Sequence, residues 1–299
     1  MRLLALVTHV WLSLLGFRRL RRQLGEWSLV FYRKGRGGEP GIGEPWVLLH
    51  GLGSNALSWS PVARHLAPGS RVLIPELSRL GGSRGPRPAL DVAEGARVVA
   101  ELLRRELAGE PATVVGLSLG GWTAVRLALA EPALVSRLIL IDSGGYRDQD
   151  WEAIRTLVTV RDDADVERLY GALFQRVPWI FRLSRTTFRR VFQSPVVKGI
   201  LADLDERDLF GPEDIARLQV PVAVIWAEHD GLFSAAVGRQ IARAARQGAF
   251  YLVPGVGHGL HWEAPRRLVA AMEEAERELP ARNIEPVATL GDAAEAPGA

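Results

Sequence analysis

The 299-residue sequence contains no cysteine. Disulfide bonds, a thiolate nucleophile and a cysteine-ligated zinc site are therefore excluded. Long apolar runs are also lacking, because the longest, residues 3–17, stops at about 15 residues and a membrane-spanning helix needs about 20. With 47% apolar and 24% charged residues, the composition is that of a globular protein with room for one large α/β domain.

Acidic residues are scarce at the N-terminus. Residues 1–36 hold one Glu against seven Arg and one Lys, a net charge of +7, which leaves −4 on the rest of a chain with a total of +3. A mildly acidic body argues against nucleic acid as a partner, since that would need a basic face. The basic segment is therefore expected to have a role of its own.

Residues 1–26 predict an apolar helix followed by four arginines, at positions 18, 19, 21 and 22. Two roles stay open: docking on a membrane surface with the arginines near anionic headgroups, or packing on the domain as an extra helix. A secretory signal fits less well, because only Arg2 precedes the apolar part and no small-residue cleavage site follows it. We expect a cytoplasmic protein, held at the inner face of the membrane if this helix binds lipid.

Strand-like and helix-like segments alternate over residues 27–145 and 213–280, which predicts a mostly parallel sheet with helices on both faces. A Gly/Pro-rich loop is expected at 35–45, a purely helical insertion at 146–212, and a disordered tail at 281–299. The expected strands are residues 27–35, 46–50, 70–77, 112–118, 135–145, 220–230 and 249–258.

The segment "GLSLGG" (116–121) stands between an expected strand and an expected helix. A Gly-x-Ser-x-Gly motif in this context indicates a nucleophile elbow, a sharp turn that exposes the serine oxygen and needs small neighbours two residues away on each side. Ser118 is therefore the candidate nucleophile.

A serine hydroxyl needs a general base, and the base needs an orienting acid. Asp230 ends the expected strand 220–230 and His258 ends the expected strand 249–258, so both would lie with Ser118 at one edge of a parallel sheet. His261 is an alternative base. Glu228 and Asp142 are alternative acids, the latter at the end of the preceding strand.

The oxyanion of an acyl-transfer reaction is usually stabilised by two backbone N–H groups. One is expected from Leu119, directly after the nucleophile, and the other from Leu52 in "HGLG" (50–53), where the glycines allow a close approach of the backbone.

The motifs "HGLG", "GLSLGG", "WAEHD" and "GVGHGLHWEAP" resemble those of the α/β-hydrolase superfamily, in the arrangement of its carboxylesterases and monoacylglycerol-lipase-like members. The resemblance covers about residues 27–280. It implies an α/β-hydrolase fold with a helical cap over the sheet edge, the triad Ser118, Asp230 and His258, and oxyanion donors at Leu52 and Leu119. The run "PELSRLGGS" (75–83) departs from the family's Asp-x-Pro-Gly-His-Gly-x-Ser.

The insertion is rich in aromatic residues, of which Trp179 and Phe181 are the candidates for an acyl pocket. The expected function is hydrolysis of carboxylic esters, lipid-like ones such as monoacylglycerols included, without metal or cofactor. A carbon–carbon bond hydrolase, a perhydrolase and a non-catalytic ligand-binding protein of the same fold are the alternatives.

Overall fold

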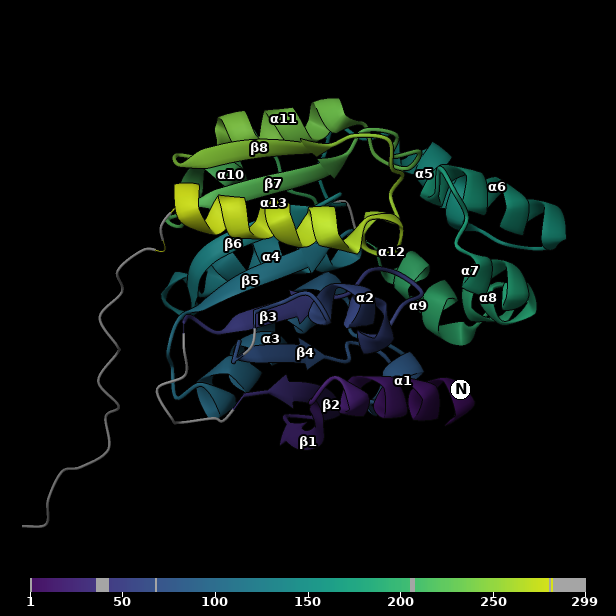
Figure 1. The fold of residues 1–299 in the computed structure, drawn as a ribbon, viewed down its shortest axis with the longest axis horizontal. Coiled ribbons are helices and arrows are strands. Elements are labelled where there is room, and N and C mark those ends of the chain that lie inside the picture. The colour runs from purple at the N-terminus through teal and green to yellow at the C-terminus, as the bar shows by residue number, and fades with distance from the viewer. Residues whose placement is uncertain (1, 36–42, 68, 205–207, 280, 282–299) are drawn as a thin grey trace, which may run out of the picture.

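A computed structural model describes residues 2–35, 43–67, 69–204, 208–279 and 281, and its centre is one eight-stranded sheet (Figure 1). Most of the expected loop at 35–45 and nearly all of the expected tail lie outside the described residues. The strand order is β1-β2-β4-β3-β5-β6-β7-β8. The strands are β1 Arg18–Leu24, β2 Trp27–Lys34, β3 Trp46–Leu49, β4 Val72–Pro75, β5 Ala112–Leu117, β6 Val135–Ile141, β7 Val222–Ala227 and β8 Gly248–Val253.

The six strands from β3 to β8 are parallel, and β1 and β2 add an antiparallel edge. The parallel strands are short Val/Leu/Ile runs because both faces of the sheet are covered. Within β6, Leu138 and Leu140 face one hydrophobic cluster, while Ile139 and Ile141 face the other. The predicted mostly parallel α/β-hydrolase sheet is confirmed.

Two groups of helices cover the sheet, as expected. The first cluster contains residues of α3 Val92–Glu106, α4 Leu119–Ala130, α10 Pro212–Arg217 and α11 Ala235–Ala244. The second contains residues of α1 Arg2–Leu14, α2 Ser60–Ala63, α12 Leu260–Glu263 and α13 Pro265–Glu278. Short 3₁₀ turns at η1 Ala56–Trp59, η2 Arg79–Gly81 and η3 Pro132–Leu134 complete the connections.

The N-terminal segment differs from its prediction. Residues 1–26 are not one helix, because α1 ends at Leu14 and the arginine-rich stretch forms strand β1. β1 pairs along its whole length with β2, and Leu24 faces Trp27 across a tight turn that contains Gly25 (φ +54°). Charged side chains are usual on such an edge strand. No described helix combines the length and the hydropathy that crossing a bilayer requires.

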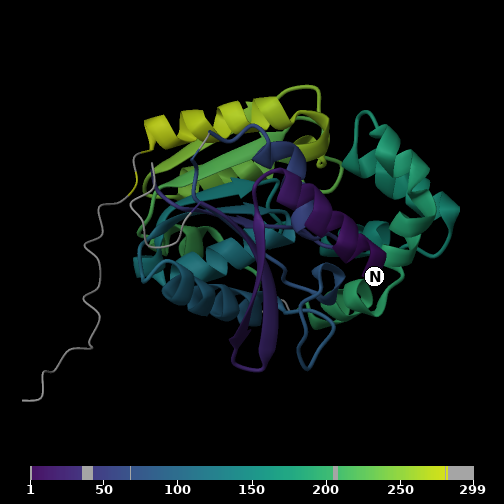
Figure 2. The same ribbon diagram turned by 60° about the horizontal axis from the view of Figure 1, so that its bottom comes forward.

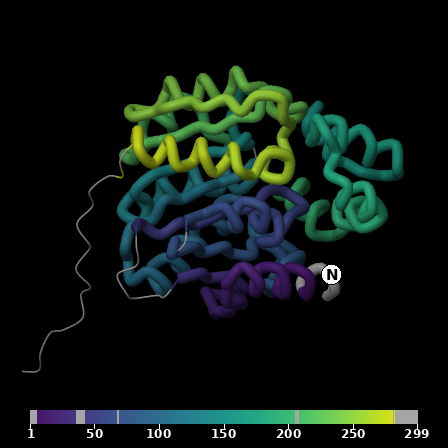
Figure 3. The backbone as a smooth tube through the Cα atoms, in the orientation of Figure 1, coloured from purple at the N-terminus to yellow at the C-terminus, as the bar shows by residue number. Residues whose placement is uncertain are grey.

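Between β6 and α10 the described chain forms five helices and adds no strand to the sheet. They are α5 Trp151–Val158, α6 Asp163–Leu173, α7 Trp179–Leu183, α8 Arg185–Phe192 and α9 Pro195–Asp203, and we call them the cap helices. The chain leaves the sheet after β6 and returns at β7 (Figure 3). The amides of Gly231 and Gly259 donate to carbonyls at the end of α6, which fixes the cap helices to the loops that follow β7 and β8.

Candidate active site

Ser118 occupies the sharp turn between β5 and α4. Its backbone has φ +55° and ψ −120°, a region that non-glycine residues rarely adopt. The flanking glycines make the turn sterically feasible. A Cβ on Gly116 would lie 2.4 Å from the Gly120 carbonyl oxygen, and a Cβ on Gly120 would lie 2.3 Å from the Leu49 carbonyl oxygen. The nucleophile-elbow geometry predicted from "GLSLGG" is therefore present.

His258 and Asp230 are hydrogen-bonded partners at the same edge of the sheet. The Nδ1–H of His258 donates to Asp230 Oδ2 over 2.8 Å, and both side chains are buried. The other oxygen, Asp230 Oδ1, accepts the backbone N–H groups of Leu232 and Phe233 at 2.8 and 3.0 Å. Because the proton of His258 is on Nδ1, the lone pair of Nε2 is available to accept a proton.

The alternative base, His261, and one alternative acid, Glu228, are less suitably placed for a catalytic role than His258 and Asp230. Burial and the neighbouring His258 lower the pKa of His261 to about 3, so this buried imidazole stays neutral, and its Nδ1 has no partner among the described residues. Glu228 is exposed, accepts the backbone N–H of Gly255, and lies 3.4 Å from His229 Nε2. His258 and Asp230 are thus the better placed pair.

Asp142 lies much closer to the pair than its separation in the sequence suggests. It follows β6 with φ +44°, is fully buried, and accepts the Ala227 N–H through Oδ1 at 2.8 Å. Ligand atoms of Asp142, Asp230 and His258 lie within 4.8 Å of one another, the only such cluster among the described residues that could hold a metal. Burial, and then the charge of Asp230, raise the pKa of Asp142 well above its usual value, which favours the neutral acid.

The loop after β3 carries Leu52, the residue predicted as the second oxyanion donor. Within the described chain, neither the N–H of Leu52 nor that of Leu119 donates to any group, and both residues line the same cavity as Ser118. His50 fixes the loop from behind: its Nδ1–H donates to the Gly51 carbonyl at 3.1 Å and its Nε2 accepts the Leu77 N–H at 3.3 Å. Two free amides beside one serine oxygen suit an oxyanion hole.

Glu76, at the departure from the family's motif, lies under this loop rather than at the rim. It is fully buried, its Oε2 accepts the Ala56 N–H at 3.2 Å, and it lies 3.8 Å from His50 Nε2. Burial raises the pKa of Glu76 to about 8 and lowers that of His50 to about 4, so both side chains are neutral near pH 7. Gly81 allows this packing, since a Cβ there would overlap the Glu76 carboxyl.

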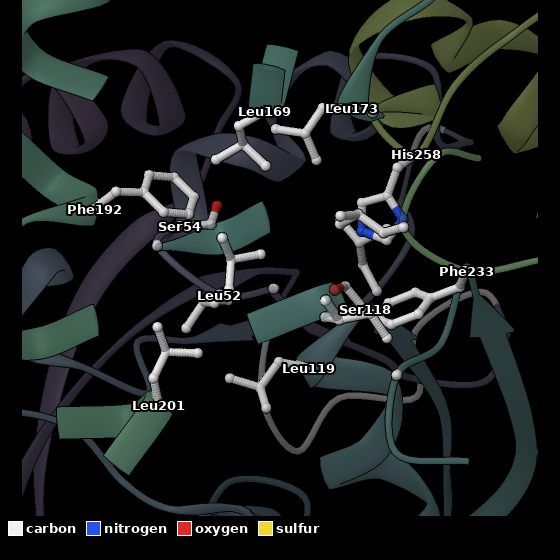
Figure 4. A pocket seen from close by; sticks show the side chains of 18 of the residues that line it. Leu52, Ser54, Ser118, Leu119, Leu169, Leu173, Phe192, Leu201, Phe233 and His258 are labelled. Carbon is white, nitrogen blue, oxygen red and sulfur yellow. The ribbon is translucent and has the colours of Figure 1, made fainter. Parts of the chain in front are cut away.

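A largely apolar cavity of about 180 Å³ opens directly onto Ser118 and His258 (Figure 4). The sheet side contributes Gly51, Leu52, Leu119, Phe233 and Trp262. The cap helices contribute Ile154, Val158, Leu169, Phe181, Phe188 and Phe192. Phe181 packs edge-on against Trp262 of α12, with ring centroids 5.2 Å apart, and so connects the cap helices to the helix that follows His258.

The two predicted acyl-pocket residues separate in the structure. Phe181 lines the cavity, and its contact with substrate stays a prediction. Trp179 does not line the cavity, because it stands two residues earlier on α7, roughly 200° around the helix, and is 71% exposed. Sequence reasoning also missed Ser54, Phe233 and Trp262 as cavity residues. For Phe233, the signal was its position three residues after Asp230.

Gly51→Ala is expected to lower kcat by about 100-fold, the typical effect of disturbing an oxyanion donor. A Cβ on Gly51 would lie 3.2 Å from Ser118 Cβ and 3.7 Å from Ser118 Oγ, which displaces the loop from the nucleophile. Leu52→Ala is the matched control, because it keeps the amide and removes only a cavity-lining side chain. We expect its effect to fall mainly on KM. Steady-state kinetics on a soluble ester decide this, and a larger loss of kcat in Leu52→Ala contradicts the assignment.

Comparisons with known proteins identify the family of the chain. The sequence model of the alpha/beta hydrolase family matches residues 46–271. A 2-hydroxy-6-oxononadienedioate/2-hydroxy-6-oxononatrienedioate hydrolase of Paraburkholderia xenovorans is 27% identical, over 83% of this chain and 90% of its own. Lipase 1 of Psychrobacter immobilis is 25% identical, over 72% and 71% of the two chains.

Among solved structures, a membrane phospholipase A described as a bacterial virulence factor superposes with a TM-score of 0.77. It shares 22% sequence identity, and the match covers 92% of this chain and 91% of the other, so it bears on the fold alone. The family match spans the six parallel strands β3 to β8 and every candidate catalytic residue. The chain belongs to the α/β-hydrolase family.

Proposed function

We propose that the protein is a serine ester hydrolase that cleaves lipid-like carboxylic esters, such as monoacylglycerols, through an acyl-enzyme on Ser118. The apolar cavity that opens onto Ser118 carries this proposal. Among its lining residues only Arg155 bears a permanent charge, and that guanidinium donates to the carbonyls of Leu201 and Leu204. An acyl chain fits such a lining, and the name of the relative Lipase 1 points the same way.

In the first half of the proposed reaction, Ser118 Oγ attacks the ester carbonyl carbon while His258 Nε2 accepts the hydroxyl proton. Asp230 holds His258 in the required tautomer through the 2.8 Å bond to Nδ1–H and stabilises the imidazolium that forms. The negative charge on the tetrahedral intermediate falls between the amides of Leu52 and Leu119. Collapse of the intermediate breaks the ester C–O bond, and His258 gives its proton to the leaving alcohol.

In the second half, water attacks the acyl carbon of the Ser118 ester. His258 Nε2 now removes the proton of the water and later returns it to Ser118 Oγ, which leaves as the free hydroxyl. The products are a carboxylic acid and an alcohol.

The carbon–carbon bond hydrolase is the alternative that the dienedioate hydrolase relative brings forward. A dioate carries two carboxylates, which need cations or several N–H donors in the binding site. In the described cavity Arg155 already serves two backbone carbonyls, and His261 is neutral. The lining therefore favours an uncharged acyl chain over a dianionic substrate.

A substrate panel tests the proposal. We expect kcat/KM on p-nitrophenyl esters to rise at least about 100-fold from acetate to octanoate, because each buried methylene contributes about 0.8 kcal/mol. Monoacylglycerol should be hydrolysed, whereas 2-hydroxy-6-oxo-dienedioates should react far more slowly. A preference for acetate contradicts the acyl cavity, and dioate cleavage faster than ester cleavage supports the carbon–carbon bond hydrolase instead.

A further inference from the structure

Large apolar side chains are exposed at only two sites of any size on the described surface. Nine such residues are exposed, and eight of them lie on α1 or α7. On α1 they are Leu6, Val7, Val10, Trp11 and Leu14; on α7 they are Trp179, Ile180 and Leu183. Leu14, Trp179 and Leu183 are more than 70% exposed, and the ninth residue, Leu252, is 38% exposed. Exposed apolar clusters of this kind mark binding surfaces.

Helix α1 has its apolar face outward. Thr8 and Leu12 are fully buried against the domain, whereas Val10 and Leu14, on the other side of the helix, face solvent. A helix that only packs on a domain shows the opposite pattern, with polar residues outward. Helix α7 divides its side chains in a similar way: Phe181 lines the cavity above Ser118, and its neighbours point out of the protein.

The same two segments are strongly basic. Residues 1–25 contain five arginines and residues 175–202 contain five arginines and a lysine, and neither segment has an acidic residue. These eleven cations leave −8 on the remainder of a chain whose total is +3. The exposed apolar residues therefore lie in the two most basic parts of an otherwise acidic protein.

Several of these cations are free to bind a ligand outside the protein. Arg185 and Arg189 pair with Asp163, and Arg22 pairs with Glu106. Five others are exposed and form no ion pair within the described part of the chain: Arg18, Arg176, Arg182, Arg190 and Lys198.

The two helices lie on one side of the molecule. In two views 60° apart, the N-terminal end of α1 lies beside the cap helices (Figures 1 and 2). We call the exposed apolar residues of α1 and α7, with the five free cations, the apolar-basic surface.

We propose that the apolar-basic surface docks the protein on an anionic phospholipid bilayer, with α7 as the wall between the bilayer and the catalytic cavity. Apolar side chains enter the interface while arginines meet the headgroup phosphates. A second copy of the chain is a poorer occupant, because a symmetric contact would set one basic surface against another. Delivery of substrate from the bilayer to the cavity, as distinct from docking, rests on the proposed ester hydrolase function.

Vesicle flotation tests docking, with full-length Ser118→Ala protein so that no lipid is hydrolysed. We expect binding to vesicles of phosphatidylcholine with 30 mol% phosphatidylglycerol, and at least about tenfold weaker binding to phosphatidylcholine alone. Adding Trp179→Ser and Leu183→Ser should weaken binding about tenfold, and so should Val10→Ser with Leu14→Ser. Leu252→Ser is the matched control and should bind unchanged.

Equal binding to both vesicle types, no loss in either double variant, or an equal loss in Leu252→Ser overturns the proposal. So does a change in oligomeric state on removal of the apolar residues, because a second copy would then be the occupant. Thermal unfolding of each variant confirms that these exposed substitutions leave the fold intact.

Kinetics separate docking from chemistry. In the otherwise wild-type enzyme, Trp179→Ser with Leu183→Ser should keep kcat/KM on soluble p-nitrophenyl butyrate and lose about tenfold on monoacylglycerol in anionic vesicles. Equal losses on both substrates overturn delivery from the bilayer. If the wild type hydrolyses neither substrate, the proposed function fails, while the flotation result still decides docking.

Discussion

We expect Ser118→Ala to remove the proposed ester hydrolysis almost completely, with a loss in kcat on the order of 10⁶, because the covalent route would disappear with the proposed nucleophile. The chain has no cysteine that could replace it as a nucleophile. The strained backbone at Ser118 (φ +55°) presents this one hydroxyl to the cavity beside His258, and the loss should appear in kcat rather than KM.

Ser54→Ala is the matched control, since Ser54 lines the same cavity (Figure 4) and its hydroxyl is 3.5 Å from the Asn55 carbonyl oxygen. Its kcat should stay within a few-fold of the wild type. A fluorophosphonate probe gives a second measurement: the wild type and Ser54→Ala should be labelled, and Ser118→Ala should not. An unlabelled wild type supports the non-catalytic ligand-binding alternative, and a labelled Ser118→Ala places the nucleophile elsewhere.

Most of the sheet could be predicted from the sequence because its strands are buried on both faces. Runs such as "VLL" in β3 and "LILI" in β6 contain only apolar residues, and glycine-rich turns follow them. Ser118, Asp230 and His258 could be proposed as candidates because each stands directly or shortly after the end of a strand, and parallel strands end at one edge of the sheet.

Strand β1 could not be recognised in this way. Its sequence, "RRLRRQL", has neither an apolar run nor a clean alternation, because most of its side chains are exposed at the edge of the sheet. β1 pairs with β2 because the chain reverses direction at Gly25. A helix over residues 1–26 would not make this turn, so the helical prediction excluded the pairing. Local pattern is a weak guide where burial does not constrain the side chains.

Trp179 and Asp142 show a second limit of prediction from sequence: local pattern gives neither the direction of a side chain nor its distance from residues on other strands. The aromatic content of the segment 177–181 correctly drew attention to α7, but only the helix axis decides that Phe181 faces the cavity while Trp179 faces solvent. Likewise, the sequence gives no distance between Asp142 and Asp230. Their proximity follows from the pairing of β6 with β7, which puts the two loops side by side.

The second prediction with a large effect tests which residue is the triad acid. Asp230→Asn should lower kcat about 10⁴-fold, as loss of the orienting carboxylate does in serine hydrolases. Asp230 Oδ1 accepts two backbone N–H groups, so the asparagine oxygen is expected to take that place. The NH₂ group then faces His258 Nδ1 at the site of the present 2.8 Å bond. Because an NH₂ group cannot accept the Nδ1 proton, that proton moves to Nε2, and His258 can no longer act as the base for Ser118.

Asp142→Asn makes the same chemical change on the neighbouring carboxyl and should leave kcat within about tenfold of the wild type. The asparagine oxygen can keep the bond to the Ala227 N–H, and its NH₂ group replaces Oδ2, which has no partner among the described residues. Since burial and Asp230 raise the pKa of Asp142 and favour its neutral acid, a neutral amide changes the charge near His258 little. The pair of variants therefore distinguishes the roles of two carboxyls whose oxygens lie within 4.8 Å of each other and of a His258 ring nitrogen. Steady-state kinetics that show the larger loss in Asp142→Asn would assign the acid to the end of β6 instead of β7.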